Sequence, residues 1–374
     1  MGVLRLLLAL SVVASHIGPI FGFQMTGGSL AVQSFFMISG FYMSLILNEK
    51  YIGINSSFKL FITNRLLKIY PLYFSVLILS LLVCLIVGFT SADHDIPVFN
   101  LYEATKPNGL TWAYLITTNI IIWGQDIVMF MGISPQNGAL YLTGNFWNTS
   151  PALYNFLFIP QGWSLALELT FYLCAPYLLR KRTSWILTVV MLSLLIRIVT
   201  FYSLSLQNDP WTYRFFPCEL MFFLLGAISY RIYTEYRDIK IPTYAGLILQ
   251  TSIIVITIAF ALLPQFPIQA FHFQVRDVLY LFLILISMPF LFIFTKNYRF
   301  DSKIGELSYT VYLVHLLVAK LLYTFGPELL KTPAFIALIS ILLSFFLNLA
   351  IAVPIERQRQ KRIKKIDVAQ VGVL

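Results

Sequence analysis

The stretch LLKIYPLYFSVLILSLLVCLIVGF, residues 66–89, carries a single charged side chain, Lys68. A helix of about 20 apolar residues covers the roughly 30 Å of hydrocarbon in a bilayer. No helical period separates an apolar from a polar face within the stretch, as expected where lipid covers one side of a helix and packed protein the other. We interpret it as a membrane span.

Blocks of the same kind recur along the whole chain. Of its 374 residues, 59% are hydrophobic and 11% charged, against roughly 25% charged residues in an ordinary soluble domain. The mean hydropathy of +0.80 excludes a water-soluble core. The pattern predicts an all-α polytopic bundle of about ten spans, with the first span retained rather than cleaved as a signal peptide. The expected spans are residues 3–22, 31–48, 66–89, 163–179, 184–205, 214–231, 243–263, 276–295, 305–325 and 333–355.

The basic residues predict how the chain threads the membrane, because Lys and Arg gather in cytoplasmic loops. With the N-terminus in the cytoplasm, the basic loops, such as residues 180–182, fall on that side. This threading requires the apolar segment 111–131 to begin and end outside, as a re-entrant or surface segment. Asp126 within it supports that placement, since a carboxylate facing lipid is costly. We expect both termini in the cytoplasm, a membrane domain of residues 1–355 and a basic tail of residues 356–374.

The formal net charge of +10 does not predict a nucleic-acid partner. The basic residues stand at the ends of apolar blocks and form no basic stripe or reading helix. The three cysteines, Cys84, Cys174 and Cys218, lie within apolar blocks without metal-ligand spacing. We interpret them as small core residues and expect neither a disulfide framework nor a metal site.

Ionisable side chains within the spans mark a functional interior, because charges are costly at membrane depth. Arg5 and His16 share one face of the first span, about 16 Å apart along its axis. An imidazole titrates near neutral pH and can take a hydroxyl proton and return it to a leaving group, so we expect His16 to be a general base. Two simpler interpretations stay open: Arg5 as a snorkelling anchor and His16 as an interhelical hydrogen-bonding residue.

Other ionisable residues are expected near the depth of His16, in the outer half of the bilayer. They are Glu168, Arg197, Glu219 and Lys320, with His315 one to two turns deeper. Each would be costly without a partner. We therefore expect these residues to face one polar, hydrated cavity.

A second basic feature stands at the start of the third span. Arg65 and Lys68 are three residues apart and thus neighbours on a helix. With Arg5 they would form a phosphate cradle at the cytoplasmic face. The simpler interpretation is that they are topology signals.

Five segments of the chain carry a further signal. They are Arg5 with His16, Ser34–Phe41 (SFFMISGF), Asn64–Pro71 (NRLLKIYP), Trp163–Tyr172 (WSLALELTFY) and Leu307–His315 (LSYTVYLVH). In this order they resemble the membrane-bound acyltransferase 3 family, which acylates sugars of surface polysaccharides, lipopolysaccharide and related glycans. Each segment is weak alone, whereas their common order is specific.

The resemblance implies an integral membrane O-acyltransferase of the bacterial inner membrane. It would move an acyl group, with acetyl as the expected case, from cytoplasmic acyl-CoA to a sugar hydroxyl of a cell-surface glycan. Lipopolysaccharide O-antigen and exopolysaccharide are the acceptors implied. Acetyl-CoA would be a co-substrate, and no permanently bound cofactor is expected.

The resemblance also assigns roles to residues. Arg5, Arg65 and Lys68 would bind the donor. His16 would activate the sugar hydroxyl or carry the acyl group itself. Glu168 would orient His16 or pair with Arg197, and Ser39 would support the polar cavity. At Lys68 the family commonly has an arginine, so the planar fork that grips a phosphate is lost there.

A different class of function also suits charges within a membrane bundle, namely a secondary transporter or flippase for a glycan or acyl unit. Such proteins often consist of two similar halves, and residues 1–180 and 184–374 share no sequence symmetry. Formation of a new ester in detergent solution, without any gradient, distinguishes an enzyme from a transporter.

Overall fold

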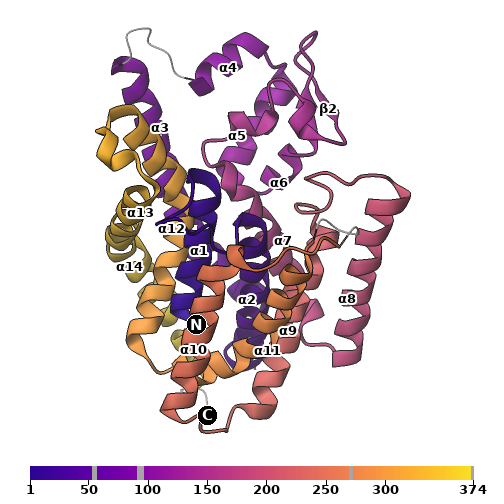
Figure 1. Cartoon of the computed structure of the whole chain (residues 1–374), viewed down its shortest axis with the longest axis vertical. Helices are drawn as coiled ribbons and strands as arrows, with labels where there is room; N and C mark the ends of the chain where they lie inside the picture. Colours follow the sequence, from indigo (N-terminus) through magenta and orange to yellow (C-terminus); the bar gives the residue numbers. More distant parts are fainter. Residues whose placement is uncertain (53–56, 91–96, 269–272, 372–374) are drawn as a thin grey trace.

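The computed structural model describes residues 1–52, 57–90, 97–268 and 273–371, and most of this part of the chain is helical (Figure 1). The long helices coincide with the apolar blocks, because a helix satisfies its own backbone polar groups in lipid. They are α1 (Gly2–Ile17), α2 (Gly28–Glu49), α3 (Phe58–Thr90), α7 (Trp163–Leu178), α8 (Thr183–Ile198), α9 (Phe216–Tyr236), α10 (Thr243–Ala259), α11 (Val275–Thr295), α12 (Arg299–Phe325), α13 (Pro333–Leu347) and α14 (Val353–Val371). The predicted all-α bundle is confirmed.

Among the described residues, eight helical segments are long and apolar enough to cross a membrane. One of them runs from α13 through a π-helical turn, Asn348–Ala352, into α14, and another extends α8 through the π-helical turn Val199–Ser203. The two remaining predicted spans correspond to α1 and α7, which have 16 residues each. Such a helix is about 24 Å long, less than the hydrocarbon thickness. The crossing of the membrane by these two helices therefore stays a prediction.

Residues 97–162, between α3 and α7, form a cap over one end of the bundle, which we name the hairpin end (top of Figure 1). It contains α4 (Pro97–Thr105), α5 (Gly109–Ile121), α6 (Gln125–Val128) and an antiparallel hairpin of β1 (Met131–Ile133) and β2 (Leu140–Leu142). α5 has 13 residues, about 20 Å of helix, which is too short to cross hydrocarbon. The predicted re-entrant or surface segment 111–131 is thus two short helices and the start of a strand.

One carboxyl group of this cap is unusual. Asp126 lies in the first turn of α6, and burial raises the pKa of its carboxyl to about 6, against the opposing effect of nearby backbone N–H groups. The group therefore takes up a proton close to neutral pH.

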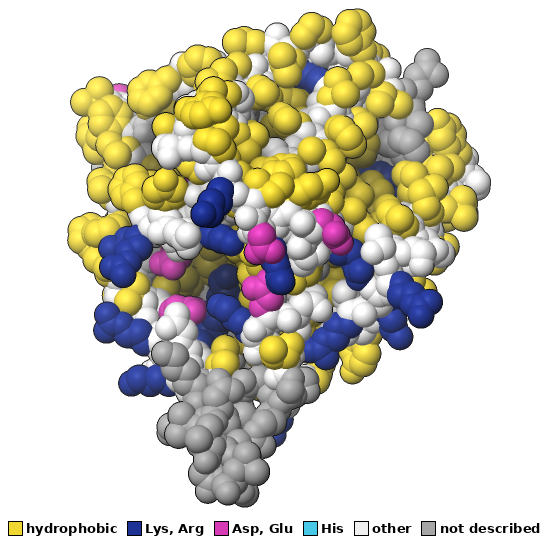
Figure 2. Space-filling model, turned by 90° about the horizontal axis from the view of Figure 1, so that it is seen from below, with side chains coloured by type: hydrophobic (Ala, Val, Ile, Leu, Met, Phe, Trp, Pro, Cys, Tyr) yellow, Lys and Arg dark blue, Asp and Glu magenta, His cyan; other side chains and the backbone are white. Residues whose placement is uncertain are grey.

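The opposite end of the bundle carries the basic loops, and we name it the basic end. Seen from this side, Lys and Arg side chains surround a hollow, with Asp and Glu among them (Figure 2). The loops follow α2, α7, α9 and α11, and they contain Lys50, residues 180–182, Arg237 with Lys240, and Lys296. This distribution has the asymmetry on which the predicted threading rests.

Two helix contacts fix the geometry of the interior. Where α2 crosses α9, a Cβ atom on Gly40 would lie 1.8 Å from the backbone oxygen of Phe223, so the two backbones touch. α1 lies along α12, and the Asp301 carboxylate accepts hydrogen bonds from the backbone N–H groups of Gly2 (2.7 Å) and Val3 (3.0 Å). A carboxylate at a helix N-terminus is stabilising. The contact sets the height of α1 against α12.

Candidate active site

A cavity of about 680 Å³ runs between α1, α2, α3, α7, α12 and α14. Lys50, Lys296 and Arg357 lie among its lining residues at the basic end, where the hollow of Figure 2 opens. Toward the hairpin end the lining extends to Ser164, in the first turn of α7, and to Tyr312 of α12. The cavity thus reaches from one face of the bundle deep into its interior.

The three residues predicted to bind the donor all line this cavity. Arg65 is 6% exposed, and within the described part of the chain its side chain has neither a hydrogen-bond nor an ion-pair partner. The guanidinium carbon of Arg5 lies 5.9 Å from the ring centroid of Tyr42. Lys68 lies in the electrostatic field of both arginines. The predicted grouping is observed, and the role of these residues in donor binding stays a prediction.

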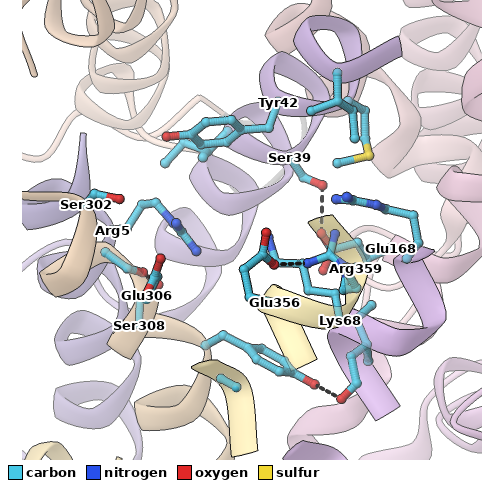
Figure 3. Close-up of a pocket in the computed structure, with 18 of the residues that line it drawn as sticks. Arg5, Ser39, Tyr42, Lys68, Glu168, Ser302, Glu306, Ser308, Glu356 and Arg359 are labelled. Atoms are coloured by element: carbon cyan, nitrogen blue, oxygen red, sulfur yellow. Dashed lines mark hydrogen bonds and ion pairs between the residues drawn. The ribbon is translucent and has the colours of Figure 1, made fainter. Parts of the chain in front are cut away.

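Glu168 of α7 lines the same cavity, together with Ser39 of α2. Its carboxylate accepts a hydrogen bond of 2.7 Å from the Ser39 hydroxyl (Figure 3) and a second one from the Tyr172 hydroxyl. The expectation that Glu168 orients His16 or pairs with Arg197 is therefore wrong. Both of its neighbours are hydroxyl donors that hold a carboxylate in place facing the cavity.

His16 and His315 form a hydrogen-bonded pair between α1 and α12. Nδ1 of His16 lies 2.9 Å from Nε2 of His315, and the rings are 5.1 Å apart at an interplanar angle of 7°. His315 is fully buried, whereas His16 stands exposed in the last turn of α1. The two residues meet because α1 is fixed along α12.

The hydrogen bonds of this pair determine which ring nitrogen of His16 is basic. Nδ1 of His315 lies 2.8 Å from the backbone oxygen of Tyr312, and a carbonyl oxygen only accepts, so this nitrogen carries the proton. Nε2 of His315 is then an acceptor, and Nδ1–H of His16 donates to it. Nε2 of His16 is left with a free lone pair on the exposed side of the ring, as a general base requires.

A thin partition separates the histidine pair from the cavity. The hydroxyls of Tyr312 and Ser164 lie 2.7 Å apart, and the Tyr312 hydroxyl donates to the backbone oxygen of Gln161 (2.8 Å). Tyr312 and Ser164 line the cavity, and neither histidine is among the described residues that line it. His315 lies close behind this wall, because its ring centroid is 6.1 Å from that of Tyr312.

Arg214, which was not among the residues predicted from the sequence, lies on the histidine side of the partition. Its charge acts on the rings of His16 and Tyr312. Asp209 holds Nε and Nη2 at 2.8 and 2.9 Å, and the guanidinium lies 4.3 Å from the ring centroid of Trp163. Among the described residues Nη1 has no partner. A fixed cation near the base can stabilise negative charge on a reacting oxygen. Its loop carries no motif, so only the fold reveals it.

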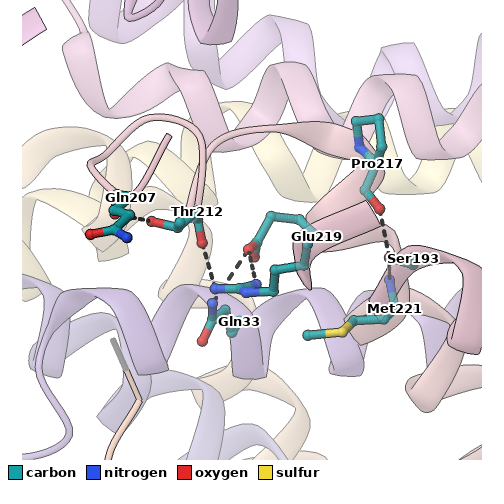
Figure 4. A network of polar contacts seen from close by, with 8 residues as sticks. Gln33, Ser193, Gln207, Thr212, Pro217, Glu219 and Met221 are labelled. Atoms are coloured by element: carbon teal, nitrogen blue, oxygen red, sulfur yellow. Dashed lines mark hydrogen bonds and ion pairs between the residues drawn. The ribbon is translucent and has the colours of Figure 1, made fainter. Parts of the chain in front are cut away.

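The single outer-half cavity expected from depth is not observed. Arg197 and Glu219 are buried in an ion pair of 3.0 Å between α8 and α9, and Arg197 also donates to the backbone oxygen of Thr212. Gln33 of α2 donates to the same carboxylate at 3.4 Å, and Figure 4 shows Gln33 and Thr212 beside Glu219. The network joins the loop before α9 to the bundle.

Lys320 is likewise separate, because its ammonium group lies 3.1 Å from the sulfur of Cys84 on α3. The residues expected in one cavity thus lie at four separate sites. Glu168 and Ser39 face the 680 Å³ cavity, His16 and His315 form a pair beyond it, Arg197 and Glu219 form a buried ion pair, and Lys320 contacts a thiol.

Comparison with known proteins identifies a family. The family described as "Acyltransferase domain" matches residues 1–357. The chain is similar to Acyltransferase MdmB of Streptomyces mycarofaciens, with 29% identity over 164 residues, which is 40% of this chain and 38% of that protein. It is also similar to Protein 2 in the picA locus of Rhizobium radiobacter, with 26% identity over 140 residues, 37% of this chain and 69% of that one. No solved structure matches the chain.

The family match extends from α1 to the start of α14 and includes all five segments quoted from the sequence. It also includes the cavity's basic residues on α1 and α3 and the histidine pair on α1 and α12. The described chain contains eight helical segments of membrane-spanning length and composition. The chain therefore belongs to the acyltransferase 3 family and is a multi-pass membrane protein.

Proposed function

We propose that this enzyme transfers an acyl group, with acetyl as the expected case, from acyl-CoA to a sugar hydroxyl of a cell-surface glycan. Lipopolysaccharide O-antigen and exopolysaccharide are the acceptor classes we have in mind. The observation that supports this proposal is the division of the site: a cation-lined cavity opens at one end, and a basic imidazole lies beyond a thin partition.

The expected orientation of the protein would give each substrate its own side of the membrane. Cytoplasmic loops are rich in Lys and Arg, so the basic end would face the cytoplasm and the hairpin end the outside of a bacterial inner membrane. Acyl-CoA, which is made in the cytoplasm, then enters the cavity. A glycan on the outer side approaches His16.

The cavity offers groups that suit such a donor. Arg5, Arg65 and Lys68 would hold its phosphates, because guanidinium and ammonium groups form strong charge-assisted hydrogen bonds to phosphate oxygens. The thioester arm would extend along α1, on which about 16 Å separates Arg5 from His16. Its acyl end would then reach the hydrogen bond between Tyr312 and Ser164. This bond would part during turnover, so that the thioester carbonyl meets the hydroxyl on the His16 side.

The chemistry on the far side follows from the tautomer of His16. Nε2 takes the proton of the sugar hydroxyl while the alkoxide oxygen forms a bond to the thioester carbonyl carbon. Nη1 of Arg214 would stabilise the negative charge that develops on the carbonyl oxygen. The C–S bond then breaks, and the thiolate of CoA takes the proton from His16, so an ester and free CoA result.

A second route transfers the acyl group first to Nε2 of His16 and then to the sugar. The two routes are separable, because only the second forms a labelled enzyme when acyl-CoA with a radioactive acyl group is supplied without acceptor. Rapid denaturation at neutral pH followed at once by intact-protein mass spectrometry would detect the acyl group, and His16→Ala should not carry it.

The outer side also offers surfaces for a sugar. The Trp147 ring is exposed and packs 4.6 Å from Phe146, which in turn lies below the Arg214 guanidinium at 5.8 Å. Flat aromatic faces with polar groups at their edges suit a ligand that is apolar on its faces and carries hydroxyls around its rim.

The proposal is tested with purified protein in detergent, acetyl-CoA and a glycan acceptor, with the new ester detected by mass spectrometry. His16→Ala should abolish ester formation while its melting temperature stays near that of the wild type. Ser15→Ala, a change of the exposed neighbour, should leave the rate unchanged. Ester formation by His16→Ala at the wild-type rate would refute the proposal. Because no gradient exists in detergent, ester formation by the wild type also excludes a transporter.

A further inference from the structure

The C-terminal helix α14 is part of the wall of the cavity rather than a separate basic tail. Arg362 of this helix donates to the side-chain oxygens of Asn64 and Thr63 on α3, both at 3.0 Å. These two bonds hold α14 against the turn of α3 that bears Arg65. Four residues of α14 beyond Glu356 line the cavity, namely Arg357, Arg359, Gln360 and Ile363.

Arg359 is the buried member of this group. It is 6% exposed, its Nη1 forms an ion pair with Glu356 one turn earlier, and its Nε has no hydrogen-bond partner among the described residues. Its charge acts on both Arg65 and Lys68. Figure 3 shows Arg359 and Lys68 facing the same opening as Glu168.

Seven Lys and Arg side chains line the cavity, against four acidic ones, which are Glu168, Asp301, Glu306 and Glu356. Glu356 is bonded to Arg359, and Glu168 is held by the hydroxyls of Ser39 and Tyr172. Arg65 has no anionic partner within the described chain. A buried guanidinium without a partner is costly. Arg65 shares the cavity with Lys68 and Arg359, and this grouping indicates that a polyanion completes the site.

We propose that Arg359 joins Arg65 and Lys68 in one phosphate-binding site, with α14 as its third wall. Its ligand class is a phosphate ester or diphosphate, as carried by a nucleotide-linked acyl donor. The planar forks of Arg65 and Arg359 approach from two helices, and Lys68 adds a point charge. Arg359 thus supplies the second planar fork, which a lysine at position 68 cannot provide. This inference rests on the proposed function and names the group that is bound at this place.

The test measures binding to the purified full-length protein in neutral detergent, with inorganic pyrophosphate and acetyl-CoA as probes. Arg359→Gln should weaken the binding of both probes at least about tenfold, the loss of one charge-assisted contact. Arg359→Lys should recover part of the affinity. The matched control is Lys361→Gln, because Lys361 is exposed on the same helix and does not line the cavity. Its affinities should equal those of the wild type.

Melting temperatures without ligand show that the variants are folded. If Arg359→Gln is folded and binds pyrophosphate as the wild type does, the inference is overturned. If pyrophosphate binding depends on Arg359 but the wild type does not bind acetyl-CoA, the phosphate site stands and the proposed donor falls. A third arm adds phosphatidylglycerol to the micelles. Stabilisation by this lipid alone, dependent on Arg359 and without any effect of pyrophosphate, would assign the cluster to a lipid headgroup and overturn the inference.

Discussion

Replacement of His315 by leucine tests whether this buried ring positions the base. The Nδ1–H of His16 donates to Nε2 of His315 over 2.9 Å, and this bond strengthens when His16 becomes an imidazolium during proton transfer. A hydrogen bond to a charged group contributes about 1.5–3 kcal/mol. With roughly 1.4 kcal/mol for each factor of ten in rate, His315→Leu should lower kcat about 10- to 150-fold.

The assay is the initial rate of ester formation at varied acetyl-CoA concentration, which separates kcat from KM. The KM for acetyl-CoA should not change, because His315 is not among the described residues that line the cavity. The matched control is His315→Gln, whose amide oxygen can still accept the hydrogen bond, and it should keep most of the activity. A purely structural role would not distinguish these two variants at equal melting temperature. If His315→Leu is folded and has the kcat of the wild type, the assignment of Nε2 of His16 as the base loses its support.

Asp126 should make the stability of the cap depend on pH. Its pKa of about 6 in the folded chain lies above its ordinary value of 3.8. The free energy of unfolding is therefore highest below about pH 4, and about 3 kcal/mol of it is lost as the pH rises through 6. Melting temperatures from pH 4 to 8 should show this decline in the wild type and not in Asp126→Asn. Gly40→Ala places a Cβ 1.8 Å from a backbone oxygen of α9 and should strongly lower the melting temperature, whereas Gly109→Ala, with no atom within 4 Å, should not. Arg197→Leu leaves Glu219 buried without its ion-pair partner and should destabilise the protein by about 3–5 kcal/mol. Replacing both residues by leucine should recover much of this loss in chemical unfolding, and a double variant less stable than the single one would contradict the pairing.

The helices could be predicted from the sequence because a bilayer imposes their length and composition together. The block around Val76–Val87 can satisfy its backbone in lipid only as a helix, and the structure places it in α3. The segment 111–131 is as apolar as the spans, and charge asymmetry between loops was needed to set it apart. The sequence spacing alone was enough to predict that Arg65 and Lys68 are neighbours, because side chains three residues apart on one helix lie next to each other.

The rest of the site depends on which helices are neighbours, and depth along a helix does not contain that information. Glu168 and Glu219 were expected in one cavity because they share a depth, yet they face different partners, Ser39 on α2 and Arg197 on α8. The pairing of His16 with His315 required the contact of α1 with α12. Costly groups at equal depth need partners, but each one takes the nearest partner that the packing provides.

The bond between Tyr312 and Ser164 has a consequence for the cell that houses this protein. A water-accessible chamber in an energised membrane would dissipate ion gradients if it were continuous from face to face. Tyr312 and Ser164 line the cavity toward the hairpin end, and their hydrogen-bonded hydroxyls, backed by the Gln161 carbonyl, would plug it there. The same plug would keep bulk water on the far side from wasting activated thioesters by hydrolysis between turnovers.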